Sequence, residues 1–213
     1  MSLSHVTFQG VTRLVGALPS ITQDEVEQTR QLLQADETFA REYGGPFVRH
    51  ALKQLPPAAA GYQYITDTKV HMVMPGWYPG IPGWHVDFAP GWEDVVDWGR
   101  VDGLERHYMA ISHGCSRTEF IDRILTLPLP AVPRINGLLS RLVSAYGDTL
   151  PKFVVVPCYL YEFTQLSLHQ VMPATHRGWR LFVRISHTRL RTPLNKIRPN
   201  GSQVYISDIH EGW

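Results

Sequence analysis

The segment QLSLHQVMPATHRGWRLFVRIS, residues 165–186, contains two strand-like runs joined by a turn. In the first run, apolar and polar residues alternate up to His169, as they do in a strand with one buried face. In the second run, WRLFVRIS, an extended chain places four alternate residues on one face: Arg180, Phe182, Arg184 and Ser186. The segment therefore predicts a β core into which two arginines point.

The same pattern of short strand-like runs extends over most of the chain from residue 61 onward. Short β-branched or aromatic runs recur there, separated by Gly, Pro and Asp: YQYI, KVHMVM, WHVDF, HYMAIS, FVVVPCYLYEF, LSLH and QVYIS. Several short strands with turn signals between them are typical of a sandwich or barrel. One helix is predicted within this region, over residues 133–146, with proline at its start and Gly147 at its end.

The N-terminal part, about residues 20–56, is predicted to be mostly helical. Thr22 and Glu25 form a capping-box pattern ahead of EVEQTRQLLQA, which predicts a helix over residues 23–35. DETFAREY and FVRHALKQL indicate further helical pieces, separated by a Gly-Gly-Pro breaker. We expect a single domain over residues 1–213, in which these helices pack on a β core formed by about residues 61–207.

Composition favours a soluble globular protein. Hydrophobic residues make up 44% and charged residues 18% of the 213 residues, and no apolar run is long enough to span a bilayer. The N-terminus lacks the features of a secretory signal, and two cysteines are too few for a disulfide framework. We therefore expect a cytoplasmic protein without membrane insertion. The sequence does not indicate its oligomeric state.

Charge is unevenly distributed along the chain. Residues 1–116 carry a net charge of −5, and residues 117–213 carry +6. A mixed solvated surface with a few functional arginines explains this asymmetry, although the basic half could also contact a nucleic acid. Because no nucleic-acid module is recognisable, a nucleic acid is the less favoured partner.

The hexapeptide GWHVDF, residues 83–88, offers two metal-ligand types with one residue between them. If the segment is extended, His85 and Asp87 leave the same face of the chain. This spacing alone is as compatible with a hydrogen-bonded pair in a loop as with a metal site. A third ligand is available in His169, which ends a strand-like run, whereas His176 lies in turn-like sequence. Two imidazoles and one carboxylate form the facial arrangement of non-haem Fe(II) oxygenases.

The two inward arginines need an anion. A guanidinium buried in a β core is costly unless it is paired, and its planar fork fits a carboxylate. A dicarboxylate co-substrate would supply such a group for Arg180 or Arg184.

The order His85-Val86-Asp87, His169, Arg184-Ile185-Ser186 resembles the H-x-D…H…R-x-S signature of the Fe(II)/2-oxoglutarate-dependent dioxygenases. The resemblance covers roughly residues 69–186. It implies a mainly β fold with flanking helices around a double-stranded β-helix, the jelly roll of cupin-like proteins. It also implies that His85, Asp87 and His169 hold Fe(II), with 2-oxoglutarate and O₂ as co-substrates.

The same resemblance implies that Arg184 and Ser186 bind the distal carboxylate of 2-oxoglutarate. Arg180 lies 11 residues beyond His169 and Arg184 lies 15 beyond it, and both separations suit some branch of the family. Ser186 favours Arg184, with Arg180 as a helper. Which arginine holds the carboxylate stays open at this point.

The expected activity is hydroxylation of a small polar metabolite, such as an amino acid. The alternatives are an oxygenase that acts on a nucleobase or nucleic acid, and a cupin-like metal protein that does not use 2-oxoglutarate. The sequence leaves open which substrate is used and whether the reaction is hydroxylation, desaturation or cyclisation.

Residues 89–106 are a candidate lid. Its acids, Glu93, Asp94, Asp97 and Asp102, could recognise a cationic substrate or could only be solvated. Three further histidines on or near predicted strands are expected to pack: His71, His107 and His113.

Overall fold

The computed structural model describes residues 3–10, 12–87, 98, 105–133, 135–199 and 204–206. The candidate lid, residues 89–106, therefore lies outside the described residues except for residues 98, 105 and 106. Of the predicted QVYIS strand, residues 204–206 are described, and they form only a single bridge, between Tyr205 and Tyr78. The described helices are α1 (Gln23–Gln28), α2 (Glu37–Tyr43), α3 (Gly45–Lys53), α4 (Ile135–Tyr146) and the 3-10 helix η2 (Gly147–Thr149). None of these described helices has the length and apolar character needed to cross a membrane.

Strands dominate the fold, so the prediction of a mainly β protein with flanking helices is confirmed. The strands are β1 (Leu3–Phe8), β2 (Arg13–Ala17), β3 (Gln31–Leu33), β4 (Gln63–Val73), β5 (Arg106–Ile111), β6 (Thr118–Ile121), β7 (Leu125–Pro130), β8 (Lys152–Val154), β9 (Tyr159–Thr164), β10 (His169–Val171), β11 (Gly178–Thr188) and β12 (Lys196–Arg198).

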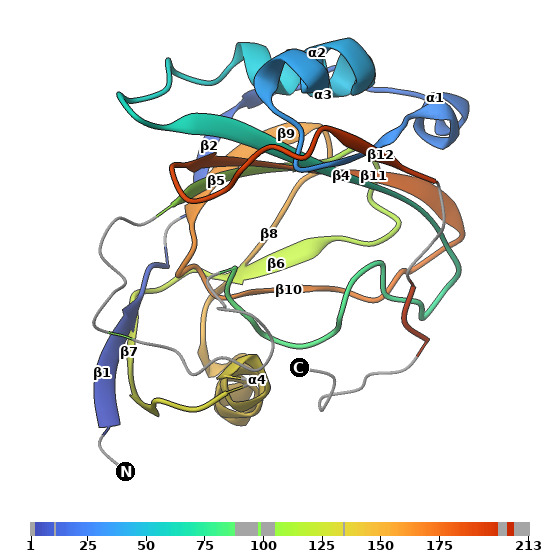
Figure 1. Cartoon of the computed structure of the whole chain (residues 1–213). Helices are drawn as coiled ribbons and strands as arrows, with labels where there is room; N and C mark the ends of the chain where they lie inside the picture. The colour runs from blue at the N-terminus through green and yellow to red at the C-terminus, as the bar shows by residue number, and fades with distance from the viewer. Residues whose placement is uncertain are drawn as a thin grey trace.

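Two antiparallel sheets face each other and form the core of a jelly roll (Figure 1). The larger sheet has the order β2-β9-β5-β11-β4, and the smaller one has the order β10-β6-β8. A main-chain bridge between His85 and His169 adds the HxD segment beside β10. From β4 to β11 the chain therefore passes repeatedly from one sheet to the other, which is the winding of a double-stranded β-helix.

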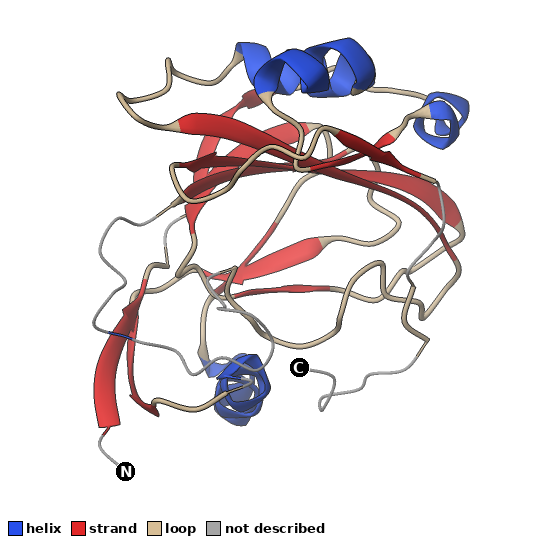
Figure 2. Ribbon diagram, in the orientation of Figure 1, coloured by secondary structure: helices blue, strands red, loops and turns tan. Residues whose placement is uncertain are grey.

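Helices α1, α2 and α3 cover the outer face of the larger sheet, and α4 lies at the opposite end of the molecule (Figure 2). The outward residues of β11 are Leu181, Val183 and Ile185, which are fully buried in one core cluster with residues of these helices. Because side chains alternate along a strand, the inward face of β11 carries the polar set that the sequence predicts. The apolar face thus fixes which residues face the space between the sheets.

The predicted helix over residues 23–35 is wrong in its second half. The capping box is present, because the Thr22 hydroxyl accepts from the Glu25 amide and the Glu25 carboxylate accepts from the Thr22 amide. However, α1 ends at Gln28, and residues 31–33 form β3, which pairs with β12. Leu32 is fully buried in the same core that the helical reading would have used. The apolar residues were assigned correctly to the interior but with the wrong period.

Strand boundaries also differ from the predicted runs. YQYI and KVHMVM belong to one continuous strand, β4. FVVVPCYLYEF instead divides into β8 and β9 around Cys158, whose φ of 59° cannot continue a strand. The WHVDF run forms only the single bridge at His85 rather than a strand. Helix α4 agrees with the prediction for residues 133–146 over its described residues.

Candidate metal and co-substrate site

His85 and His169 are held side by side by their own backbones. The His85 amide donates to the His169 carbonyl at 2.9 Å, and the His169 amide donates to the His85 carbonyl at 3.0 Å. The two ring centroids are 4.3 Å apart. The rings therefore lie together because of a β-bridge between two segments that are 84 residues apart in the sequence.

Both imidazoles are oriented by a backbone carbonyl two residues earlier. Nδ1 of His85 lies 2.9 Å from the Gly83 oxygen, and Nδ1 of His169 lies 2.9 Å from the Ser167 oxygen. Because a carbonyl oxygen only accepts, each Nδ1 carries a proton, and Nε2 is the ring atom of each histidine that is left to bind a metal. Burial, followed by His169, lowers the pKa of His85 to about 3, which keeps this ring neutral. The His85 ring is therefore in the state that a metal requires, and both rings have the orientation that a backbone carbonyl gives to a metal ligand.

Asp87 completes the predicted triad and is shared with Arg184. Its Oδ2 lies 4.0 Å from Nε2 of His169, and its Oδ1 accepts from Nη1 of Arg184 at 2.8 Å. Burial acts to raise the pKa of Asp87, but Arg184 and then His169 outweigh it and hold the pKa far below its usual range. Asp87 is therefore a carboxylate at any pH at which the protein works.

The triad is more open than a loaded metal site. Among the residues that the structure describes, no group of three His, Cys, Asp or Glu side chains stands in metal-binding geometry. Adjacent ligand atoms at about 2.1 Å from an octahedral ion are about 3 Å apart, whereas Asp87 Oδ2 and His169 Nε2 are 4.0 Å apart. A movement of about 1 Å would bring these two atoms to that separation.

Arg184 is already neutralised within the protein. Besides Asp87, it contacts Oδ2 of Asp67 through Nη2 at 3.3 Å. Asp87 raises the pKa of Arg184 more than burial lowers it, and Asp67 adds to the increase. Ser186, the other predicted carboxylate ligand, lies 3.0 Å from Nδ1 of His107, and both side chains are fully buried. The R-x-S pair thus has internal partners that the sequence did not indicate.

Arg180 is in a different position. Its side chain is 2% exposed, its Nε donates to the Ser116 carbonyl at 2.9 Å, and its Nη2 lies 3.4 Å from the Thr118 hydroxyl. No acidic residue among those described forms a salt bridge with it. Burial lowers the pKa of Arg180 to about 10, yet the group stays charged at neutral pH. Keeping a guanidinium charged in a buried position without an acid costs free energy, and an anion in contact with it would reduce that cost.

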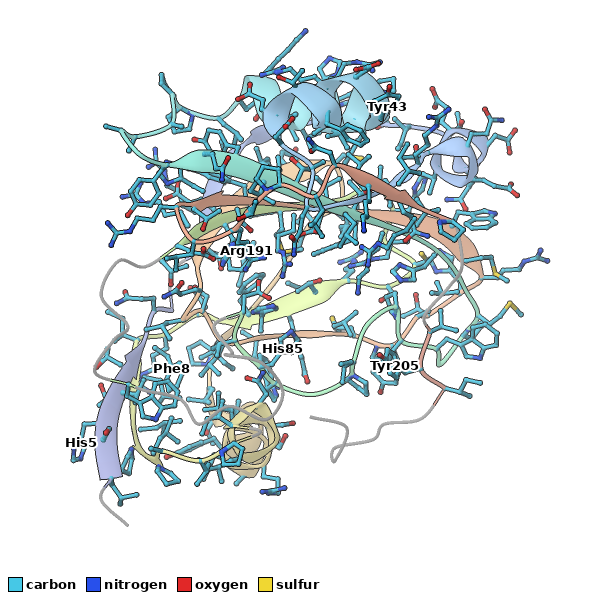
Figure 3. All side chains as sticks on the ribbon, viewed as in Figure 1. His5, Phe8, Tyr43, His85, Arg191 and Tyr205 are labelled. Atoms are coloured by element: carbon cyan, nitrogen blue, oxygen red, sulfur yellow. The ribbon has the colours of Figure 1, made fainter. Side chains whose placement is uncertain are left out.

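These side chains border one cavity of about 450 Å³ between the two sheets. The volume is within the range of small-molecule sites. His85 and Arg191 both line it, and Figure 3 shows the two between the sheets. Its described lining contains five cationic residues and two acidic ones: Lys69, Arg180, Arg184, Arg191 and Arg198 against Asp67 and Asp87. The cavity is therefore suited to anions.

Several cavity residues were missed from the sequence or assigned to packing. Asp67, Lys69 and His71 alternate along β4 and face the cavity, although His71 was expected only to pack. The signal was present in YITDTKVHMV, because polar residues at every second position of an apolar strand mark a polar face. His176, the rejected candidate ligand, is exposed in its turn and does not line the cavity.

Comparison with known proteins adds a distant likeness only. No protein-family model matches the chain, and no curated protein matches it. One similar solved structure is the crystal structure of EvdO2 from Micromonospora carbonacea var. aurantiaca, at 12% identity and a TM-score of 0.40 over 79% of this chain and 71% of that one. Another is the same protein complexed with 2-oxoglutarate, at 12% identity and a TM-score of 0.39 over 86% and 72%. A likeness this remote says nothing about the chemistry of the present cavity.

Proposed function

We propose that the protein is an Fe(II)- and 2-oxoglutarate-dependent oxygenase that hydroxylates a small molecule. One observation carries the proposal: two histidines with fixed tautomers and the carboxylate of Asp87 border the same cavity as Arg180, a buried cation without a described acid. A metal site and an anion site in one enclosed space suit a reaction between a metal and a carboxylate co-substrate.

The donor set fits iron. His85, His169 and Asp87 would hold Fe(II), because two imidazoles and one carboxylate on one side of the ion match the facial triad. Bound there, iron would supply the reaction with O₂ and 2-oxoglutarate that places oxygen on an unactivated C–H bond. Arg184 acts on the triad as a positioning residue, because it holds Oδ1 of Asp87 and leaves Oδ2 toward His169. Hydrogen-bonded ligating carboxylates of this kind are common around metal sites.

Arg180 is assigned to the distal carboxylate of 2-oxoglutarate. The charge of Arg184 is already balanced by two carboxylates within reach of its terminal nitrogens, although its buried Nε has no described partner, and Ser186 contacts His107. The described partners of Arg180 are a carbonyl, a hydroxyl and the Phe182 ring, whose centroid lies 5.4 Å from the guanidinium carbon, and none of these is an anion. A carboxylate placed on its guanidinium would receive charge-assisted hydrogen bonds in a site from which water is largely excluded.

Apolar side chains separate the metal ligands from bulk water. Phe120 stacks on the His169 ring at 5.1 Å between centroids, and Phe163 meets the same ring edge-on at 5.5 Å. Met109 and Phe163 are almost completely buried in the cluster between the sheets, and both line the cavity. These apolar side chains would keep water away from the reacting atoms and strengthen the electrostatic contacts inside the cavity.

The test is an anaerobic titration of the metal-free protein with Fe(II) and then 2-oxoglutarate, monitored through the visible charge-transfer band of the chelate. We expect the band in the wild-type protein, no band in His169→Ala, and a band that needs much more 2-oxoglutarate in Arg180→Met. Arg177→Met, which removes an exposed arginine of the nearby turn, is the matched control and should behave as wild type.

Each alternative has its own outcome. Iron binding without the band would favour a cupin-like metal protein that does not use 2-oxoglutarate. Failure of the wild-type protein to bind iron would refute the proposal. A normal band in Arg180→Met together with a weakened band in Arg184→Met would show that Arg184, and not Arg180, binds the distal carboxylate of 2-oxoglutarate.

A further inference from the structure

The cavity contains more unpaired cationic side chains than the distal carboxylate of one 2-oxoglutarate would pair with. Its two acids, Asp67 and Asp87, are both taken by Arg184. Arg191 is matched by Glu105, whose carboxylate lies 3.3 Å from its Nη2. After these pairs, three cationic side chains remain without a salt bridge to any described acid: Lys69, Arg180 and Arg198.

The three cations lie on strands β11, β4 and β12, toward one side of the cavity. Arg180 is on β11 and Lys69 is on its neighbour β4, where it is the cross-strand partner of Phe182. Beyond β4 comes β3, joined to it by main-chain hydrogen bonds between Ala35 and Thr66, and then β12 with Arg198. Arg180 is thus the innermost of the three, and the pair of Lys69 and Arg198 is displaced toward the β12 side.

The environment of this pair indicates that a partner is missing. Nε of Arg198 is buried and has no hydrogen-bond partner within the described part of the chain. Burial lowers the pKa of Lys69, and Arg184 and Arg198 lower it further. Both side chains are only half-buried, so a ligand in the cavity could reach them. Asp67 acts in the opposite direction but forms its salt bridge with Arg184, so the two like charges lack a paired acid and would be stabilised by an anion.

We propose that Lys69 and Arg198 bind an anionic group of the substrate, which is therefore a small molecule that carries a phosphate, sulfate or carboxylate. This inference rests on the proposed function, because it takes Arg180 as the partner of 2-oxoglutarate. It differs from the expectation of a cationic substrate, which depended on acids in residues 89–106 that lie outside the described part of the chain. The described lining of the cavity favours the opposite charge.

The probe for the test is inorganic phosphate, with Mn(II) in place of Fe(II). The Mn(II) protein is saturated with 2-oxoglutarate, phosphate is titrated in by calorimetry, and the ³¹P line width is recorded. Phosphate bound in the cavity is close to the paramagnetic ion, so its resonance should broaden. Lys69→Met and Arg198→Met should each weaken phosphate binding about 10- to 100-fold, the usual effect of losing a hydrogen bond to a charged group.

Two controls separate this site from general charge effects. Lys196→Met removes an exposed lysine on β12, two residues from Arg198, and should leave phosphate affinity unchanged. The affinity for 2-oxoglutarate should be the same in Lys69→Met and Arg198→Met as in wild type. Acetate is titrated in parallel, and a preference for acetate or phosphate identifies a carboxylate or a phosphoryl-type group.

The outcomes distinguish the two proposals. Loss of 2-oxoglutarate affinity in Lys69→Met, with no phosphate binding beside 2-oxoglutarate, would overturn the inference, because the extra cations would then serve the co-substrate. If the wild-type protein binds neither Mn(II) nor 2-oxoglutarate, the proposed function fails. Phosphate is then titrated into the metal-free protein, where binding that depends on Lys69 and Arg198 would support an anion site and absence of binding would refute it.

Discussion

Replacing Arg180 by methionine should abolish the response of the protein to 2-oxoglutarate while the fold is retained. Methionine keeps most of the length and apolar volume of the side chain but removes the charge. The variant therefore asks whether the buried guanidinium is present for the fold or for a ligand.

The stability of the ligand-free protein should change little. A pKa lowered from 12.5 to about 10 corresponds to a cost of about 3 kcal/mol for keeping Arg180 charged. Against this, the substitution leaves the Ser116 carbonyl without its donor and removes the contact to Thr118, a loss of about 1–3 kcal/mol. The two effects oppose each other, so the free energy of unfolding should stay within about 2 kcal/mol of wild type.

The effect on 2-oxoglutarate should be large by comparison. Two charge-assisted hydrogen bonds at about 1.5 kcal/mol each give about 3 kcal/mol, or about a 150-fold change in Kd. At a concentration of about 100 times the wild-type Kd, 2-oxoglutarate stabilises the wild-type protein by about 2.7 kcal/mol. The variant would gain only about 0.3 kcal/mol under the same conditions. For a chain of this size these values correspond to shifts in Tm of about 5–10 °C and about 1 °C.

Thermal unfolding of the Mn(II)-loaded protein, with and without 2-oxoglutarate, measures both quantities. The shift caused by Mn(II) alone is recorded first and shows that the metal site is intact in each variant. Arg177→Met is again the control, because this exposed arginine belongs to the turn before β11. A full 2-oxoglutarate shift in Arg180→Met would refute the assignment of Arg180, and a loss of stability well above 2 kcal/mol without ligand would show that its role is structural.

Three further predictions concern the metal and pH. His169→Ala should lower Fe(II) or Mn(II) affinity by more than the 10- to 100-fold typical of changes around a metal ligand, and equilibrium dialysis with wild-type affinity would contradict ligation. Arg184→Gln should lower metal affinity about 10- to 100-fold, because Oδ1 of Asp87 loses its donor; unchanged affinity in the same assay would exclude a positioning role. Burial, followed by Arg180 and Lys69, lowers the pKa of His71 from 6.5 to about 3 in the folded protein. As the pH falls below 6.5, the unfolded chain takes up a proton at His71 that the folded protein does not, so the free energy of unfolding decreases. The free energy of unfolding measured with urea should decrease by about 2 kcal/mol between pH 7 and 5 because of this residue. His71→Leu should lack this decrease. The same pH dependence in His71→Leu as in wild type would contradict the prediction.

The sequence predicted the positions that depend on alternation and order. His169 was predicted to end a strand and instead begins β10, but the structure places it beside His85, as the signature required. The inward set on β11 follows from the period of two, because its other face is a continuous apolar stripe. In these places a local pattern and the global fold demand the same arrangement.

The sequence is least informative where residues far away in the chain decide which contacts a segment makes. Residues 31–33 have apolar residues that suit a helix, but β12 offers an edge with which they pair, so tertiary context overrides the local preference. The role of Arg184 and Ser186 in the signature stays a prediction, but the sequence did not show that Arg184 also contacts Asp67 or that Ser186 contacts His107, which lie on other strands. No spacing within the second half of the chain could reveal those partners.

The geometry of the cavity depends on the packing of the opposite face of the sheet. On β4 and β11 the cross-strand partners are Asp67 with Arg184, Lys69 with Phe182, and His71 with Arg180. A slip of one residue in either strand would turn all of these side chains outward into the apolar layer beneath the helices. Such a slip would expose the fully buried outer residues of β11 to the cavity, at a cost of about 1.5–3 kcal/mol for each large side chain. The apolar residues under α1 to α3 therefore fix the register, and the register in turn brings the charged residues into the arrangement that binds anions.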